Sequence, residues 1–353
     1  MLRISNIFFR KPIVLIIFLI IIILGLASLA SFLIFNQDNK KLNQKELKIT
    51  PVAEKRRMPR QIDGVLVTEE KANLYPIAIT IENMVEARPT SGLSRANLVY
   101  EALTEGGITR FLAFYAFDEE IKKIGPIRSA RPYFLDWAEE FRAFYLHVGG
   151  SPEALKKISQ YQIFDLNQYF NGKYFWRAKN RSAPHNVYTS SKLLSQALKD
   201  KKIPLEGNYQ SWLFKDENNL KDDQSKINKI TINYSTFPYR VRWEYSFLDN
   251  SYKRFQAEKP HLETDGSEIK VKNVIIQIVK TYVLDEIGRR RKETLGKGKA
   301  LIFQDGQVIE GKWIKKTKGA RTRFYDDLDQ EIKFNRGIAW IQVVPDEKIV
   351  SYE

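Results

Sequence analysis

The stretch PIAITIENMVEARPTSGLSRANLVYEALTEGGITRFLAFYAF (residues 76–117) decides the fold of this chain. It contains three runs rich in β-branched and aromatic residues, PIAITIE (76–82), NLVYEAL (97–103) and TRFLAFYAF (109–117), with turn residues between them. Short runs of this kind, bounded by turn residues, are typical of β-strands. The stretch therefore predicts three successive strands.

Helices are predicted to alternate with further strands after this stretch. ARPYFLDWAEEF (130–141) has helical character and precedes RAFYLHV (142–148), another strand. In GGSPEALKKI (149–158), Ser151 can cap a helix, Pro152 fits its first position and Glu153 complements its dipole. SSKLLSQALKDKK (190–202) has leucines at helical spacing. Strands that alternate with helices indicate an α/β domain.

The carboxyl half is predicted to be a mostly antiparallel β domain. It follows a polar stretch at 215–228 and contains the strand-like runs ITINYSTFPYRVRWEYSF (230–247) and NVIIQIVKTYVL (273–284). Asp305-Gly306 is a strong hairpin signal. Trp313 and Trp340 are expected to lie in the core, without a role in chemistry.

The amino terminus predicts a membrane anchor. Residues 13–35 contain no charge and, as a helix, span roughly the 30 Å hydrocarbon core. Arg3, Arg10 and Lys11 precede this run, which places the amino terminus in the cytoplasm and the bulk of the chain outside the cell membrane. A cleaved signal peptide is the alternative, because ASLAS (27–31) offers small residues for a peptidase. The length of the apolar run favours an uncleaved, single-pass anchor.

The expected organisation therefore has six parts. They are a basic cytoplasmic tail (1–12), a transmembrane helix (13–35), a polar stalk (36–62), an α/β domain (63–214), a linker (215–228) and a β-rich domain (229–353). No internal repeat is visible.

Composition limits the chemistry that this chain can carry out. Lys and Arg number 57 against 42 Asp and Glu, so anionic partners are favoured. The chain has no cysteine, which excludes disulfides, thiolate nucleophiles and lipid attachment to cysteine. Three histidines without helical ligand spacing argue against a dedicated zinc site. A Mg²⁺ or Ca²⁺ site built from carboxylates stays open, but no EF-hand pattern is present and no metal is expected. Without a phosphate-binding loop, nucleophile elbow or dinucleotide fingerprint, no cofactor is expected.

An arginine cluster is the main candidate site. KIGPIRSARPYFLDW (123–137) carries Arg128, Ser129 and Arg131 after a Gly-Pro turn, and Arg88 and Arg110 also lie beside Gly or Pro turns. Turns gather at one edge of an α/β sheet, so these arginines are expected to converge and to bind phosphate or carboxylate. The alternative is that they pair with Glu101, Glu105 and Asp136 and hold the loops together.

Two further polar segments add candidates. Gly149, Gly150 and Ser151 lie between a strand and a helix, where free backbone N–H groups can meet an anion. An ordinary capped turn explains them equally well. His147, just before them, is either a hydrogen-bonded core histidine or a base. In RSAPHNVYTS (181–190), His185 and Asn186 are ligand candidates, and a local turn is the alternative.

The long segments quoted above, together with GKGKALIFQDGQVIEGKWIKK (296–316) and GIAWIQVVP (337–345), resemble the YerB-like family of bacterial envelope proteins, whose function is unknown. The resemblance covers about residues 62–348 and implies an α/β domain followed by a β domain. Many members are lipoproteins, and this chain lacks the cysteine that would carry the lipid. The signature positions fall on Asn83, Arg88, Gly92, Tyr100, Glu101, Glu105, Gly106, Arg110, Arg128, Arg131, His147, Ser151 and His185.

These observations lead to one hypothesis and two alternatives. The first is an extracytoplasmic binding or scaffold protein whose arginine-lined cleft recognises an anionic envelope polymer, a lipid-linked phosphate or a protein partner. The second is an enzyme acting on a phosphate-linked envelope substrate with Glu105 or His147 as acid or base, similar in layout alone to the LytR-CpsA-Psr phosphotransferases. The run RRRK (289–292) suggests nucleic acid, but the predicted export argues against it.

Overall fold

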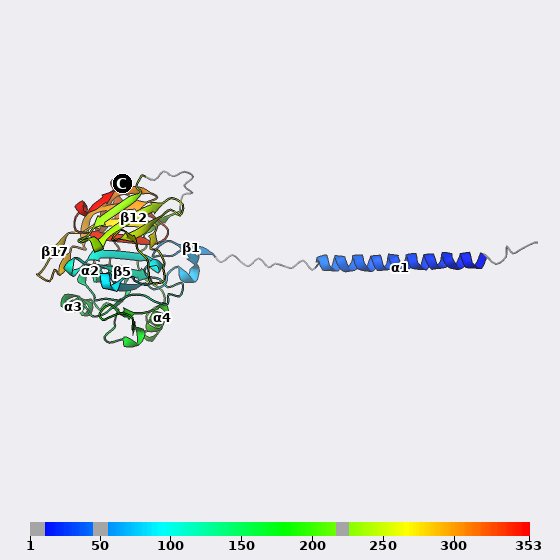
Figure 1. Ribbon diagram of the computed structural model, residues 1–353, viewed down its shortest axis with the longest axis horizontal. Helices are drawn as coiled ribbons and strands as arrows, with labels where there is room; N and C mark the ends of the chain where they lie inside the picture. Colours follow the sequence, from blue (N-terminus) through cyan, green and yellow to red (C-terminus); the bar gives the residue numbers. More distant parts are fainter. Residues whose placement is uncertain (1–10, 45–55, 217–225) are drawn as a thin grey trace, which may run out of the picture. The chain divides into compact units, whose positions relative to one another are not determined.

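The computed structural model describes residues 11–44, 56–216 and 226–353, which divide into two units. Within the first unit, 1–55, lies helix α1 (Lys11–Gln44), and the second unit is the compact Arg56–Glu353 (Figure 1). Leu15–Gln37 of α1 has a mean hydropathy of 3.0 and is long enough to cross a membrane. Residues 1–10 of the predicted tail, 45–55 of the predicted stalk and 217–225 of the predicted linker lie outside the described residues.

Packed structure begins earlier than the predicted end of the stalk. Strand β1 (Arg57–Pro59) pairs antiparallel with β2 (Leu66–Thr68). Between them, Ile62 is buried, and Arg60 forms a buried ion pair with Asp63 at 2.6 Å. Residues 56–62 therefore belong to the compact unit, a correction to the predicted stalk (36–62).

A ten-stranded mixed sheet forms the centre of the compact unit, in the order β21-β20-β19-β16-β23-β4-β5-β3-β6-β7. The strands from the amino-terminal region are β3 (Ile77–Glu82), β4 (Leu98–Leu103), β5 (Thr109–Tyr115), β6 (Phe144–His147) and β7 (Asp165–Asn167). Those from the carboxyl-terminal region are β16 (Asn273–Ile278), β19 (Gly296–Gln304), β20 (Gln307–Lys315), β21 (Arg323–Asp326) and β23 (Ala339–Val344).

The two regions meet in the middle of this sheet. Strand β23 pairs in parallel with β4, with Trp340 opposite Val99, and also in parallel with β16 on its other side. The α/β region and the β-rich region are therefore distinct in sequence but share one sheet and one compact unit. The carboxyl-terminal region is mostly antiparallel, as predicted, and among its described strands β23 and β22 (Lys333–Asn335) form parallel pairs.

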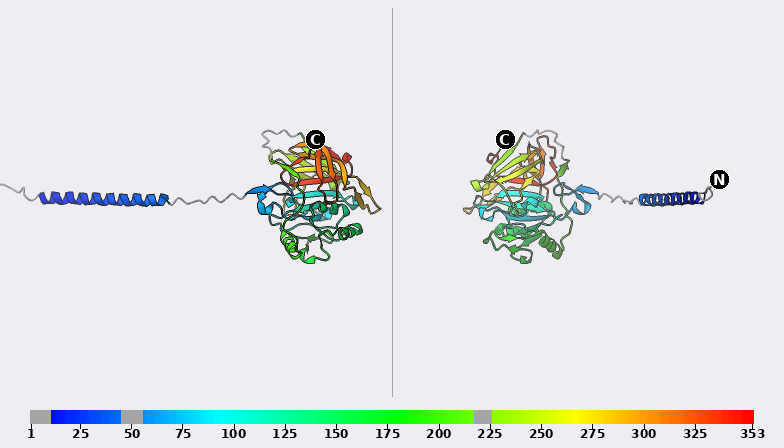
Figure 2. Two further views of the ribbon diagram at one scale, coloured as in Figure 1. Left: turned by 180° about the vertical axis from the view of Figure 1, so that it is seen from behind. Right: turned by 45° about the vertical axis from the view of Figure 1, so that its right-hand side comes forward.

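A second, six-stranded sheet covers part of the first. It contains β11 (Lys229–Asn233), β12 (Arg240–Ser246), β13 (Ser251–Gln256), β14 (Lys259–Pro260), β15 (Lys270–Val271) and β24 (Val350–Tyr352). This sheet lies on the side of the compact unit where the chain ends, and α4 lies on the opposite side (Figures 1 and 2). Three small sheets pair β8 (Trp176–Arg177) with β9 (Val187–Tyr188), β10 (Leu213–Lys215) with β22 (Lys333–Asn335), and β17 (Thr281–Val283) with β18 (Arg290–Lys292).

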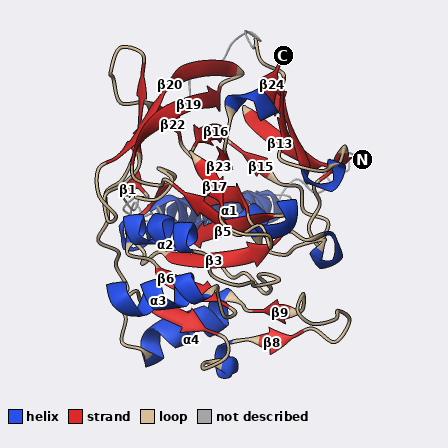
Figure 3. Ribbon diagram, turned by 90° about the vertical axis from the view of Figure 1, so that its left-hand side faces the viewer, coloured by secondary structure: helices blue, strands red, loops and turns tan. Residues whose placement is uncertain are grey.

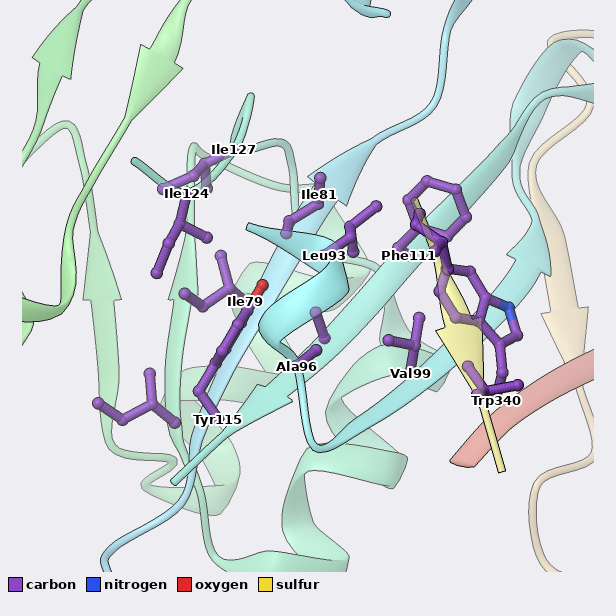
Figure 4. Close-up of a cluster of buried hydrophobic side chains, with 14 of the residues drawn as sticks. Ile79, Ile81, Leu93, Ala96, Val99, Phe111, Tyr115, Ile124, Ile127 and Trp340 are labelled. Atoms are coloured by element: carbon purple, nitrogen blue, oxygen red, sulfur yellow. The ribbon is translucent and has the colours of Figure 1, made fainter. Parts of the chain in front are cut away.

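Two hydrophobic cores lie on opposite faces of the ten-stranded sheet. Alternate side chains of β4 point to different cores, so that Leu98 and Tyr100 enter one and Val99 the other, as the period of two requires. The first core is covered by helices α2 (Pro132–Ala138) and α3 (Pro152–Tyr161) (Figure 3). The second is covered by α4 (Ser191–Asp200) and the second sheet. Figure 4 shows part of this second core.

Local sequence signals agree well with the structure. Ser151 and Ser190 cap α3 and α4, accepting hydrogen bonds from Ala154 N and Leu193 N. Asp305 and Gly306, both at positive φ, form the two-residue turn between β19 and β20. The predicted strand 273–284 is wrong in one respect, because it is divided into β16 and β17, which belong to different sheets.

Candidate functional site

The predicted arginine cluster is organised by Glu82, at the carboxyl end of β3. Its cross-strand neighbour is Arg110, at the start of β5, whose Nε lies 3.4 Å from Glu82 Oε1. From the loop before α2, Arg128 places Nε 2.5 Å from Glu82 Oε2. His185 Nδ1 lies 3.7 Å from the same oxygen. The Glu82 side chain is only 1% exposed. This buried carboxylate therefore contacts three separate segments: β5, the loop before α2 and the loop that carries His185.

A second carboxylate, Glu105, holds the arginine next to the start of α2. Arg131 donates from Nε and Nη2 to the two oxygens of Glu105 at 2.5 and 2.7 Å, a bidentate pair, and from Nη1 to the Ala130 carbonyl. Burial alone would raise the pKa of Glu105, but the hydrogen bonds and charge of Arg131 outweigh it, so the pKa is lowered. Glu105 therefore stays ionised and its partner's fork is fully occupied.

Arg110 lies between the two carboxylates. Its Nη1 is 3.8 Å from Glu105 Oε2 and, among the described residues, has no hydrogen-bond partner. Burial is the main reason that the pKa of Arg110 is lowered. With Arg128 and Arg131, three guanidinium groups face the two carboxylates of Glu82 and Glu105, which leaves one excess positive charge.

Arg128 differs from the other two arginines because part of it remains accessible. Its side chain is 23% exposed, against 7% for Arg110 and 13% for Arg131. Its closest contact with Glu82 is through Nε, and within the described ranges neither terminal nitrogen forms a hydrogen bond. Ser129, next to it, is partly exposed.

The remaining candidates are used structurally. Arg88 donates to Oδ1 and the carbonyl of Asn83, lies 5.0 Å from the Tyr239 ring, and has a pKa lowered to about 10, chiefly by burial. Asn186 accepts from Arg177 Nη1 and donates to the Arg181 carbonyl. These two side chains belong to the neighbouring loops, and among the described residues neither forms a hydrogen bond or ion pair with Glu82 or Glu105.

The turn after β6 has most of its N–H groups occupied. Gly149 N donates to Asn167 Oδ1 and Ser151 N donates to the Ala130 carbonyl. The Ser151 hydroxyl is the α3 cap. Of the three expected anion-binding amides, only that of Gly150 is left without a hydrogen bond in the described structure, so the capped-turn alternative describes this segment.

His147 is a buried, hydrogen-bonded histidine. Its Nδ1 lies 2.6 Å from the Gly149 carbonyl, its Nε2 lies 3.0 Å from Asp165 Oδ2, and its ring stacks on Tyr145. It is fully buried, and Glu105 is engaged by Arg131, so neither group is placed to exchange a proton with a substrate at the arginine cluster. The arrangement does not favour the enzyme alternative.

Two other carboxylates that were considered as partners have different ones. Glu101, fully buried on β4, accepts two hydrogen bonds from Arg254 Nη2, at 3.0 and 2.8 Å. Asp136 pairs with Lys157 at 2.5 Å. Glu82 and Arg254 were missed as candidates, because nothing in the local sequence distinguishes a buried charge from a solvated one. No group of three His, Asp or Glu that could hold a metal is found among the described residues.

Comparisons with known proteins agree with the two regions of the fold. Residues 63–204 match the family model "Protein of unknown function (DUF3048) N-terminal domain", and residues 230–341 match that of its C-terminal domain. The chain is 31% identical over 295 residues to "Putative lipoprotein YerB" of Bacillus subtilis (strain 168), covering 82% of this chain and 87% of the relative. A crystal structure of the YerB protein from Bacillus subtilis matches with a TM-score of 0.75, covering 83% of this chain and 98% of that one.

Proposed function

The chain belongs to the DUF3048 family, with both of its regions in one compact unit, and from this premise we propose that it is a single-pass membrane protein that holds this unit outside the cytoplasm. The apolar span Leu15–Gln37 supports the anchor, and the three basic residues before it support a cytoplasmic amino terminus. Its relative carries the description "Putative lipoprotein". Because this chain has no cysteine to carry a lipid, the helix takes the place of a lipid anchor.

The absence of cysteine allows a direct test of this topology. Single cysteines are introduced by Ser5→Cys and by Leu248→Cys, the latter at a side chain that is 97% exposed. In cells stripped of outer layers, a membrane-impermeant maleimide is expected to label the Leu248→Cys protein directly and the Ser5→Cys protein after permeabilisation alone. The reverse pattern would contradict the proposed orientation, and loss of the protein from the membrane fraction would contradict the anchor.

We infer that the compact unit is a binding module whose arginine cluster recognises an anionic group, such as a phosphate or a carboxylate. The observation that carries this inference is Arg128, whose two terminal nitrogens form no hydrogen bond in the described structure and whose side chain is partly exposed. The excess positive charge of the cluster supports the same reading. Glu82 and Glu105 hold the guanidinium groups in fixed positions, which lowers the entropy lost when an anion binds.

A thermal melt of residues 56–353 tests this inference. Pyrophosphate at about a hundred times its dissociation constant is expected to stabilise the wild type by about 2.7 kcal/mol. Arg128→Ala is expected to abolish the effect. Arg95→Ala, which removes an exposed arginine paired with Glu119, is the matched control and should respond like the wild type. The inference is contradicted if pyrophosphate does not stabilise the wild type and Arg128→Ala melts far below the wild type. The cluster would then hold the loops together and have no ligand.

A further inference from the structure

A groove beside the edge of the ten-stranded sheet contains polar groups without partners. Its volume is about 450 Å³, and it lies between α3 and β7, the last strand of the sheet. Ser159 lines it from α3, Gln162 from the end of that helix, Asp165 and Asn167 from β7, and Phe170 from the following turn. None of these residues belongs to the arginine cluster.

Asn167 presents a fixed hydrogen-bond donor at this groove. Although the residue is only 7% exposed, its side chain lines the groove. Oδ1 accepts from the backbone N–H groups of Gly149 and Tyr169, at 3.1 and 3.3 Å. Because an N–H group can only donate, these two bonds fix which end of the amide is oxygen. The other end of the amide is therefore Nδ2, which is a donor. Among the described residues it has no hydrogen-bond partner.

Asp165 presents a fixed acceptor on the same face of the strand, two residues or about 6.6 Å away. Its Oδ2 faces His147 Nε2 at 3.0 Å, and His147 Nδ1 must donate to the Gly149 carbonyl, because a carbonyl only accepts. The bond between Nε2 and Oδ2 requires one further proton, carried by either atom, and through it the buried ring holds the carboxyl group of Asp165 in place. Asp165 Oδ1 has no described partner, and the side chain is 30% exposed.

The same segment carries unusually exposed aromatic rings. Tyr161, Phe164, Tyr169 and Phe170 are 40%, 60%, 67% and 85% exposed, four aromatic residues within ten. A flat ring can pack against the apolar face of another ring, while donors and acceptors beside it fix orientation. We propose that this groove binds a neutral saccharide, with a pyranose ring against Phe170 and hydroxyl groups on Asn167 Nδ2 and Asp165 Oδ1. A sugar hydroxyl both donates and accepts, so it suits both partners.

Two other ligand classes fit the groove less well. A polypeptide added as a strand to β7 needs the outer backbone groups of that edge. The Asn167 carbonyl already accepts from Phe170 N and Asn171 Nδ2, at 3.1 and 2.9 Å. An added strand could therefore not form a hydrogen bond with this carbonyl. An anionic ligand would meet the Asp165 carboxylate. The groups that remain available to a ligand are Asn167 Nδ2, Asp165 Oδ1 and the exposed aromatic rings.

Saturation-transfer NMR tests the proposal with residues 56–353 and two probes, the N-acetylglucosamine trimer and maltotriose. This part is expected to fold by itself, since it is one compact unit and the solved YerB chain matches 83% of this chain over 98% of its own length. Phe170→Ser removes an 85% exposed ring and Asn167→Asp keeps the acceptor while removing the donor. Phe237→Ser, at a ring that is 59% exposed and lies on the short 3₁₀ helix η7 (Phe237–Tyr239), is the matched control.

At least one probe is expected to receive saturation from the wild type and from Phe237→Ser, and both groove variants should weaken its binding about tenfold or more. The proposal is overturned if neither probe receives saturation at about 10 mM, a concentration that detects millimolar affinity. It is also overturned if all four proteins bind equally, or if an uncharged pentapeptide binds in place of both sugars. The result is independent of the pyrophosphate experiment, because the two sites share no residue.

Discussion

The buried pair of Glu101 and Arg254 joins the two family regions, and Glu101→Gln is the perturbation that tests its importance. Glu101 accepts two hydrogen bonds from Arg254, one from Trp340 Nε1 at 3.1 Å and one from the Thr109 hydroxyl at 2.9 Å. Both side chains of the ion pair are fully buried. A glutamine would leave the Arg254 charge uncompensated and direct an amide N–H toward other donors. Removing one partner of a buried pair costs about 3–5 kcal/mol.

Urea denaturation of residues 56–353, followed by fluorescence and circular dichroism, measures this cost. The variant is expected to lose about 3–5 kcal/mol of unfolding free energy and to keep a single transition, because one sheet crosses both regions. Glu119→Gln, which breaks the exposed pair with Arg95, is the control and should cost at most about 1 kcal/mol. A loss for Glu101→Gln as small as the control's, or two separate transitions, would refute the reasoning.

Three further predictions concern pH, backbone strain and capping. Burial, and then the Arg254 charge, lower the pKa of His261 well below 6.5, so the unfolded chain binds this proton first as pH falls. Between pH 6.5 and 5 the wild type should therefore lose more stability than His261→Gln, by at most about 2 kcal/mol in urea denaturation, and equal losses would contradict this. Gly149→Ala forces a side chain onto φ +58° and toward the Tyr169 ring, so thermal melts should show a loss of about 1–2 kcal/mol, and an unchanged melt would count against the left-handed turn. Ser190→Ala removes the cap of α4 from Leu193 N and should cost about 1 kcal/mol in the same assay, where no loss would mean that the cap is not needed.

The local elements of this fold could be predicted because their signals are local. Alternation and β-branched residues gave strands β3, β4 and β5, and Ser-Pro or Ser-Ser starts gave α3 and α4. The pairing of β4 with β23, which joins the two regions, could not be predicted. The two strands are about 240 residues apart, and neither sequence indicates which strand lies beside it. A polar stretch between two regions marks a boundary in sequence, and it does not prevent their strands from sharing a sheet.

The candidate site could be predicted in place and less well in detail. The turns did bring Arg110, Arg128 and Arg131 together, as the sheet-edge argument required. Their partners could not be foreseen, because Glu82 is the last residue of a strand in which every residue is buried. The pairing of Glu101 with Arg254 depends on packing between distant segments, and it removed Glu101 from the cluster. Arg131 is used to hold loops together through Glu105, and anion binding at Arg128 stays a prediction.

The central claim, that the arginine cluster binds an anionic group through Arg128, is tested most directly by ³¹P NMR of pyrophosphate titrated with residues 56–353. The account predicts that the phosphorus resonance broadens with the wild type and with Arg95→Ala, and stays sharp with a folded Arg128→Ala protein. Broadening of equal size with all three proteins, or with none of them, would contradict it.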